Sequence, residues 1–171
     1  MHPPRSKGDR EVREGGWWGL EKGAVTTISG RTVGEVAITA PTTLPADTTV
    51  EQVRAAFTDA HVHVVLLVED PRLPRTRLLG TLVRDDLPDG AAGSTTALQL
   101  ATLTGRTVDP ATPVLDAHRR LLASGQRRLA VVGPQHELVG LLCLRSDGVK
   151  FCTDAGVAAR QCERAANEAR R

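Results

Sequence analysis

Two stretches of the chain carry the same succession of hydrophobic and polar positions. In each, apolar residues recur every three or four positions, as on one face of a helix, and a continuous apolar run typical of a buried strand follows. The helical patterns begin at Val50 and Val114, which are 64 positions apart. The apolar runs are 64–68 and 129–132, and after a turn each is followed by a second run, 78–83 or 138–143. The pattern therefore predicts an internal repeat.

A short segment bounded by proline precedes each predicted helix. Residues 41–45 and 106–110 are suited to strands, because a residue before proline avoids the helical region. Each copy is thus predicted as β-α-β-β-α, and Asp86 falls at the start of the last helix of the first copy. Since a unit of about 60 residues buries too little surface to be stable alone, the copies should share one core. We expect an α/β (α+β) fold of two pseudo-symmetric β-α-β-β-α repeats packed face to face through their sheets.

The same pattern divides the chain into five parts. The N-terminal part is rich in glycine and charge and is predicted to be a flexible tail, in which Trp17 and Trp18 could anchor to this protein or to a partner. The C-terminal part is predicted to be a helix with a stripe of small residues, which could pair with a second copy or lie across the same chain. The stripe consists of Ala155, Ala158, Cys162, Ala165 and Ala169. The predicted parts are 1–31 (tail), 32–88 (first repeat), 89–96 (flexible linker), 97–148 (second repeat) and 149–171 (C-terminal helix).

Composition narrows the class of protein. Aromatic residues make up 2% of the 171 residues, with two tryptophans, two phenylalanines and no tyrosine, so any core must be aliphatic. The net charge is only +2. The sequence also lacks the cluster of basic and aromatic residues that is typical of a nucleic-acid binder. We find no secretory signal and no segment apolar enough to cross a bilayer. The three cysteines are an odd number, which favours reduced thiols and a cytoplasmic location.

The repeat resembles a tandem pair of cystathionine-β-synthase-type (CBS) domains, often called a Bateman module. The stretch Gly80-Thr81-Leu82-Val83-Arg84-Asp85-Asp86-Leu87 is similar to the family's Gly-apolar-apolar-Thr-x-x-Asp motif, and residues 32–41 are similar to the start of the family's domain. The resemblance covers about residues 32–148. It implies a non-enzymatic regulatory module that holds an adenine nucleotide in clefts between the copies and acts as a homodimer. The implied ligands are AMP, ADP, ATP or another adenosyl compound, with no required cofactor.

The resemblance also implies the binding residues. It places Asp86 where the family's ribose-binding aspartate lies, although an aspartate there could equally cap a helix. It places Val83 and Cys143 where a hydroxyl residue is usual, and Ser146 at the second aspartate position. His63 and Arg128 fall near positions that approach ligand phosphates. Thr39 and Thr102 complete the implied nucleotide-binding set.

Other candidate chemistry has a simpler structural explanation. His61 and His63 would share one face of an extended segment, but two histidines make an incomplete metal site, so we predict no metal. Cys143 lies in an apolar strand and is predicted to be a buried thiol without a catalytic role. The pairs Arg119-Arg120 and Arg127-Arg128 could bind phosphate or be ordinary solvated ends of elements. Alternative functions are a ligand-free interaction or dimerisation module, or an accessory subunit for an unknown protein partner.

Overall fold

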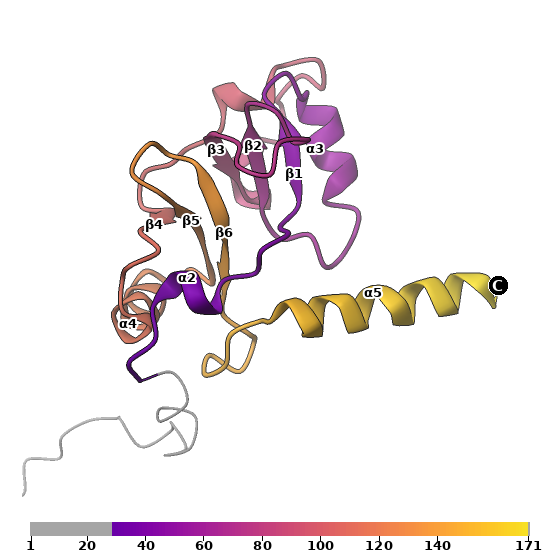
Figure 1. Cartoon of the computed structure of the whole chain (residues 1–171). Coiled ribbons are helices and arrows are strands. Elements are labelled where there is room, and N and C mark those ends of the chain that lie inside the picture. Colours follow the sequence, from indigo (N-terminus) through magenta and orange to yellow (C-terminus); the bar gives the residue numbers. More distant parts are fainter. Residues whose placement is uncertain (1–28, 171) are drawn as a thin grey trace, which may run out of the picture.

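The structure is a computed structural model, and it describes residues 29–170. The greater part of the predicted tail, with Trp17 and Trp18, lies outside these residues. Two three-stranded sheets stand beside each other, one for each predicted repeat, and the helices α3 and α4 lie at opposite ends of the molecule (Figure 1). The fold therefore has the two-repeat arrangement that the hydrophobic pattern predicts.

The first repeat forms the sheet β1-β2-β3, in which β1 is parallel and β3 antiparallel to β2. Its helix begins at a capping residue, since the Thr49 hydroxyl oxygen accepts a hydrogen bond from the Gln52 N–H and the Gln52 side chain accepts one from the Thr49 N–H. The elements are β1 (Thr43–Pro45), α3 (Val50–Ala56), β2 (Val65–Val68) and β3 (Leu78–Leu82).

The second repeat forms the sheet β4-β5-β6 with the same order and directions. Its helix ends at Gly125, where φ is +67°, a left-handed conformation that glycine adopts without a steric penalty. The elements are β4 (Thr107–Val108), α4 (Val114–Ser124), β5 (Arg128–Val132) and β6 (Leu138–Cys143). In each copy, the first predicted strand, the predicted helix and the two strands that follow it are therefore confirmed.

The prediction of a final helix in the first copy is wrong. Asp86 ends a 3-10 turn, η1 (Arg84–Asp86), and a second 3-10 turn, η2 (Ala97–Gln99), follows without an α-helix between them. Leu87 precedes Pro88 and so leaves the helical region, and the glycines of the linker do not favour a helix. The helix predicted for the C-terminal part, 149–171, exists as α5 (Asp154–Ala169).

The two sheets face each other across an aliphatic layer, as predicted. Strands β2 and β3 contribute Leu66, Val68 and Leu78, and the facing strands contribute Ala130, Val132, Leu138 and Leu141. One backbone bridge joins the sheets where the Leu78 N–H donates to the His136 carbonyl and the Leu138 N–H donates to the Thr76 carbonyl, both at 2.8 Å. Further apolar layers lie under α3 and α4, so the order of layers is helix, sheet, sheet, helix.

The segments that lead into the two repeats are exchanged. Ile38, which precedes β1 of the first repeat, pairs with Leu141 on β6, and Thr102, which precedes β4 of the second, pairs with Thr81 on β3. The short helix α2 (Val33–Val36) packs on α4 and β6, and Val33 is fully buried in the core of the second repeat. Ala97 is likewise buried in the core of the first repeat. Each repeat is therefore completed by the lead-in segment of the other.

Close backbone approach at these crossings requires two glycines. A Cβ on Gly140 would lie 2.5 Å from the carbonyl oxygen of Ile38, and a Cβ on Gly80 would lie 2.5 Å from the Cβ of Ala101. Real Cβ atoms do not approach other atoms so closely, so the two equivalent glycines admit the two lead-in segments.

The linker and α5 both contact the first repeat. Gly93 and Thr95 in the predicted flexible linker accept hydrogen bonds from the Glu51 and Val50 N–H groups at the start of α3. Helix α5 projects from the second repeat beneath the first (Figure 1), where Arg164 forms an ion pair with Asp59 at 2.7 Å. The small residues of the predicted stripe on α5 are exposed in this single chain. The stripe thus does not lie across the body of its own chain, and pairing with a second copy stays a prediction.

Candidate functional site

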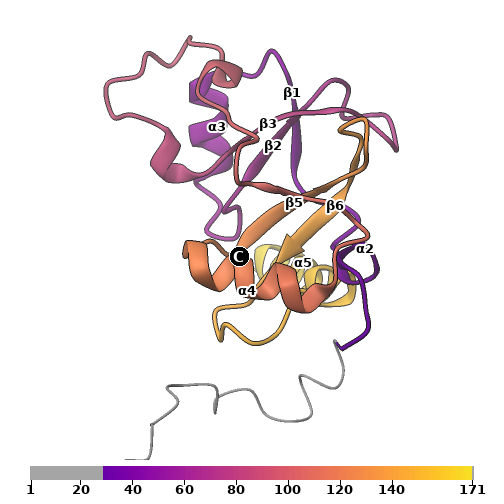
Figure 2. The same cartoon turned by 90° about the vertical axis from the view of Figure 1, so that its left-hand side faces the viewer.

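Two clefts open between the repeats. Cleft 1, about 440 Å³, lies between the end of β3, the approach to β4 and the start of β5. Cleft 2, about 380 Å³, lies between the segment 38–42, the approach to β2, the end of β6 and one face of α5. Both repeats contribute lining residues to each cleft. Figure 2 shows that α5 passes on the side of the second sheet away from α4, where it forms a wall of cleft 2.

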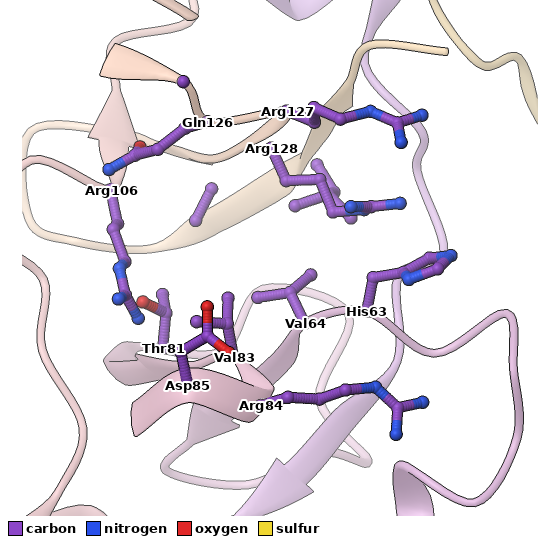
Figure 3. A pocket seen from close by; sticks show the side chains of 13 residues that line it. His63, Val64, Thr81, Val83, Arg84, Asp85, Arg106, Gln126, Arg127 and Arg128 are labelled. Carbon is purple, nitrogen blue, oxygen red and sulfur yellow. The ribbon is translucent and has the colours of Figure 1, made fainter. Parts of the chain in front are cut away.

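A cluster of basic side chains, the basic centre, lines both clefts. It consists of His63 from the first repeat and Arg127 and Arg128 from the second. Figure 3 shows these three side chains and that of Arg84 pointing toward the same side of the cleft. Arg127 donates to the Leu144 carbonyl oxygen at 3.3 Å, and none of the ion pairs within residues 29–170 involves Arg127 or Arg128.

The basic centre disfavours a positive charge on His63. Partial burial and then the positive charges of Arg128, Arg127 and Arg84 lower the pKa of His63 below its ordinary value of 6.5. Burial and neighbouring cations both disfavour the charged imidazole. A bound phosphate would offset this repulsion and would accept hydrogen bonds from the guanidinium groups.

The predicted ribose-binding residue of cleft 1 has another partner. The Asp86 carboxylate forms a two-point ion pair with Arg106, in which Nη2 lies 2.7 Å from Oδ1, and it also accepts a hydrogen bond from the Val83 N–H at 2.7 Å. Both side chains are less than one fifth exposed. Arg106, Val83 and Asp85 line cleft 1, whereas Asp86 is not among its lining residues. In this structure the Asp86 carboxylate is therefore engaged by Arg106 rather than directed into the cleft.

The Asp86–Arg106 pair predicts a loss of stability in acid. Burial raises the pKa of Asp86, but the hydrogen bonds from Arg106 and the Val83 N–H, with the charge of Arg106, bring it below its ordinary value of 3.8. A carboxyl with a lowered pKa in the folded state stabilises the fold above its unfolded pKa, and this contribution is lost as the pH falls through the folded pKa. We expect Asp86→Asn to lower the free energy of unfolding at pH 7 by about 1–2 kcal/mol, after allowance for solvent screening.

Urea unfolding of wild type and Asp86→Asn between pH 7 and the acid limit of folding measures this difference, which should disappear in acid. Asp85→Asn is the matched control, because Asp85 is exposed and makes no ion pair within residues 29–170. An equal loss in both variants, or a difference that persists in acid, would contradict a stabilising Asp86–Arg106 pair.

Cleft 2 contains Cys143 and Ser146, two of the residues predicted for the second copy. Cys143 is buried in its wall, and Ser146 is exposed at its edge. The neighbouring Asp147 carboxylate points into its own turn, where it accepts hydrogen bonds from the Val149 and Lys150 N–H groups. These two hydrogen bonds lower the pKa of Asp147. Ser146, rather than Asp147, therefore faces the cleft.

The two predicted threonines lie beside the clefts rather than in their walls. The Thr39 N–H and hydroxyl both donate to the Asp154 carboxylate at 2.9 Å, which fixes the first lead-in segment to the start of α5. Thr102 pairs through its backbone with Thr81, and its hydroxyl oxygen accepts from the Thr104 N–H. Neither threonine is among the lining residues. The structure brings together His63, Val83 and Arg128 in cleft 1 and His63, Arg128, Cys143 and Ser146 in cleft 2.

Several arginines in the clefts are absent from the predicted set. Arg160 and Arg164 from α5 and Arg145 after β6 line cleft 2, and Arg84 and Arg106 line cleft 1. The spacing of Arg160 and Arg164 places them on one face of α5, a signal that the sequence does contain. The other predicted pair, Arg119-Arg120, is not in either cleft, and Arg119 pairs with Asp116 at 3.1 Å.

The part of the chain that the structure describes was searched for metal-binding groups and for helices that could span a membrane. Between residues 29 and 170, no group of three His, Cys, Asp or Glu side chains is arranged to hold a metal ion. No described helix combines the length and the apolar character that spanning a membrane requires.

Comparison with known proteins finds one matching family and several solved structures with a similar fold. The CBS domain family matches residues 106–146, and no curated protein matches the chain. A CBS domain protein from Pyrobaculum aerophilum complexed with AMP is 22% identical, with a TM-score of 0.53, over 66% of this chain and 86% of its own. CBSX2 in complex with AMP is 23% identical, with a TM-score of 0.57, over 78% and 99%. The cytosolic domain of the Mg²⁺ channel MgtE in complex with ATP is 22% identical, with a TM-score of 0.54, over 73% and 50%. At these identities the likeness shows the fold.

Proposed function

We propose that the chain is a regulatory module that binds an adenine nucleotide between its repeats, because residues 106–146 match the CBS domain family and the two repeats together have a fold similar to that of CBS domain proteins. The single observation that carries the proposal is the basic centre of His63, Arg127 and Arg128, which lines both clefts. Among the proteins with a similar fold, the Pyrobaculum aerophilum CBS domain protein and CBSX2 are in complex with AMP, and the cytosolic domain of MgtE is in complex with ATP. We further propose that the chain has no catalytic activity of its own.

The nucleotide phosphates would occupy the basic centre. Two guanidinium groups and one imidazole can donate several hydrogen bonds to phosphate oxygens, and Arg145 and Arg160 add positive charge at cleft 2. A ligand with more phosphates would meet more of these groups. The proposal therefore favours ATP and ADP over AMP, and it gives adenosine little affinity.

The base and ribose would use aliphatic and small polar groups. Phe57, the aromatic residue within the two repeats, is buried and has Arg84 above its ring, so it cannot stack on a base. Val64 and Leu141 offer aliphatic surface in both clefts. The Asp86–Arg106 pair obstructs a ribose in cleft 1, whereas Ser146 is open to a ribose in cleft 2. We place the nucleotide in cleft 2.

Thermal unfolding with and without nucleotide tests the proposal. A ligand that binds only the folded state stabilises it by about 2.7 kcal/mol at a concentration 100 times its Kd. We expect ATP to raise the melting temperature most, ADP less and AMP least, and adenosine to have little effect. Calorimetric titration should give one nucleotide per chain. No shift with any of these nucleotides at millimolar concentration would overturn the proposal and favour a ligand-free interaction module.

The remaining expectations from the resemblance stay predictions. They concern assembly into a homodimer, a protein partner that the module regulates, and a cytoplasmic location. Each can be examined independently of the nucleotide.

A further inference from the structure

We propose that Cys143 and Cys152 form an oxidisable dithiol, a modification site at which a two-electron oxidant such as hydrogen peroxide produces an intrachain disulfide. This inference does not depend on nucleotide binding. It rests on the positions of the two sulfur atoms, on their different exposure and on their place in the wall of cleft 2.

The backbone holds the two cysteines opposite each other. Leu144 and Phe151 pair as neighbours in a short antiparallel bridge, and the Cys152 N–H donates to the Cys143 carbonyl oxygen at 2.7 Å. Residues directly opposite in antiparallel strands have Cα atoms about 4.5–5.5 Å apart, which lies within the span of about 4.4–6.8 Å that a disulfide bridges. The Cys152 Sγ already lies 3.0 Å from the Cys143 Sγ. A disulfide therefore needs only a small approach of the sulfurs.

The two thiols have different environments. Cys143 is 8% exposed, whereas Cys152 is half-buried and borders cleft 2. Burial, followed by the hydrogen bond with Cys152, raises the pKa of the Cys143 thiol to about 11. An oxidant reacts with an accessible thiolate, so Cys152 is the thiol that reacts first and Cys143 is the thiol that completes the disulfide.

The reaction balances with peroxide as the oxidant. The Cys152 thiolate attacks one peroxide oxygen, the O–O bond breaks, and the released hydroxide takes up a proton to become water. The sulfur of Cys143 then attacks the sulfur of the Cys152 sulfenic acid, the S–S bond forms, and the hydroxyl group leaves with a proton as a second water. Two thiols are oxidised to one disulfide, and one peroxide is reduced to two waters.

The disulfide would close the loop between β6 and α5. This loop carries Arg145 and Ser146, which line cleft 2, and it leads directly into the helix that forms another wall. The oxidised state would therefore hold the loop and the start of α5 together covalently. We expect the oxidised protein to have a higher melting temperature than the reduced protein, and dithiothreitol to reverse the change.

Peptide mapping after peroxide treatment tests the site. Trypsin cleaves after Arg145 and Lys150, which places the two cysteines on different peptides. In wild type and in Cys162→Ser, we expect a linked peptide pair whose mass is lower than the sum of the free peptides by two hydrogen atoms. Cys162→Ser is the control because Cys162 is the exposed third thiol, on α5.

The single variants distinguish the two roles. In Cys143→Ser, Cys152 should pass to sulfinic acid because no second thiol intercepts the sulfenic acid, and in Cys152→Ser the buried Cys143 should stay reduced. Circular dichroism checks that both variants fold. Conversion of Cys152 to sulfinic acid in wild type without a linked pair, or linkage only through Cys162, would overturn the proposal.

Discussion

Replacing Arg127 and Arg128 together with glutamine is expected to weaken ATP binding about a hundredfold or more. Each hydrogen bond to a charged group contributes about 1.5–3 kcal/mol, so loss of one from each arginine removes about 3–6 kcal/mol. Since 1.4 kcal/mol corresponds to a tenfold change in Kd, the affinity falls by at least about two orders of magnitude. Calorimetric titration of both proteins with ATP measures the change.

The chain offers a matched control for this double substitution. Arg119 and Arg120 are also adjacent arginines, and neither lines cleft 1 or cleft 2. Arg119→Gln with Arg120→Gln removes the same charge from the same repeat, so it should leave the affinity nearly unchanged. Similar losses of ATP affinity in the two double variants would mean that the net charge of the protein, and not the position of Arg127 and Arg128, determines the affinity. Unchanged affinity in the Arg127 and Arg128 variant would place the phosphates elsewhere.

Gly140→Ala is expected to lower the free energy of unfolding by about 2–3 kcal/mol, because overpacking at a close contact costs that order of energy. The added methyl group would lie 2.5 Å from the carbonyl oxygen of Ile38 and 3.2 Å from the Cβ of Ala37. Relief requires the first lead-in segment to move away from β6. The two hydrogen bonds between Ile38 and Leu141, each 2.9 Å, would then lengthen.

Gly90→Ala is the control, because a Cβ at Gly90 meets no atom within 4 Å. This variant should keep or slightly increase the stability, since alanine reduces the freedom of the unfolded chain. Urea unfolding of the two variants and the wild type gives both free energies. Equal stability of Gly140→Ala and Gly90→Ala would contradict a tight crossing at β6.

Local patterns predict most elements of this fold. The buried strands β2 and β5 and the helices α3 and α4 follow from the spacing of their own apolar residues, which needs no knowledge of the rest of the chain. The helix expected to begin near Asp86 fails for an equally local reason, since Pro88 and the glycines that follow it end the turn. The duplicated order predicts that the sheets face each other.

Contacts between distant segments are not predicted in this way. The exchange of the lead-in segments depends on which strand edge each one meets, and a short extended segment carries no signal for its partner. The Asp86–Arg106 pair joins residues from different repeats, so the sequence identifies the carboxylate but not the arginine that occupies it. His63 and Arg128 are predicted at the clefts through the resemblance, whereas the contribution of α5 depends on the direction in which that helix leaves β6.

The exchanged lead-in segments mean that the repeat in the sequence and the unit that folds are different. A cut in the linker 89–96 would leave Val33 on the N-terminal fragment, although this residue fills the core of the C-terminal one. The C-terminal fragment would carry away Ala97, which fills the core of the first. Neither half is therefore expected to fold as an autonomous domain, whereas the two fragments mixed together should reassemble by complementation.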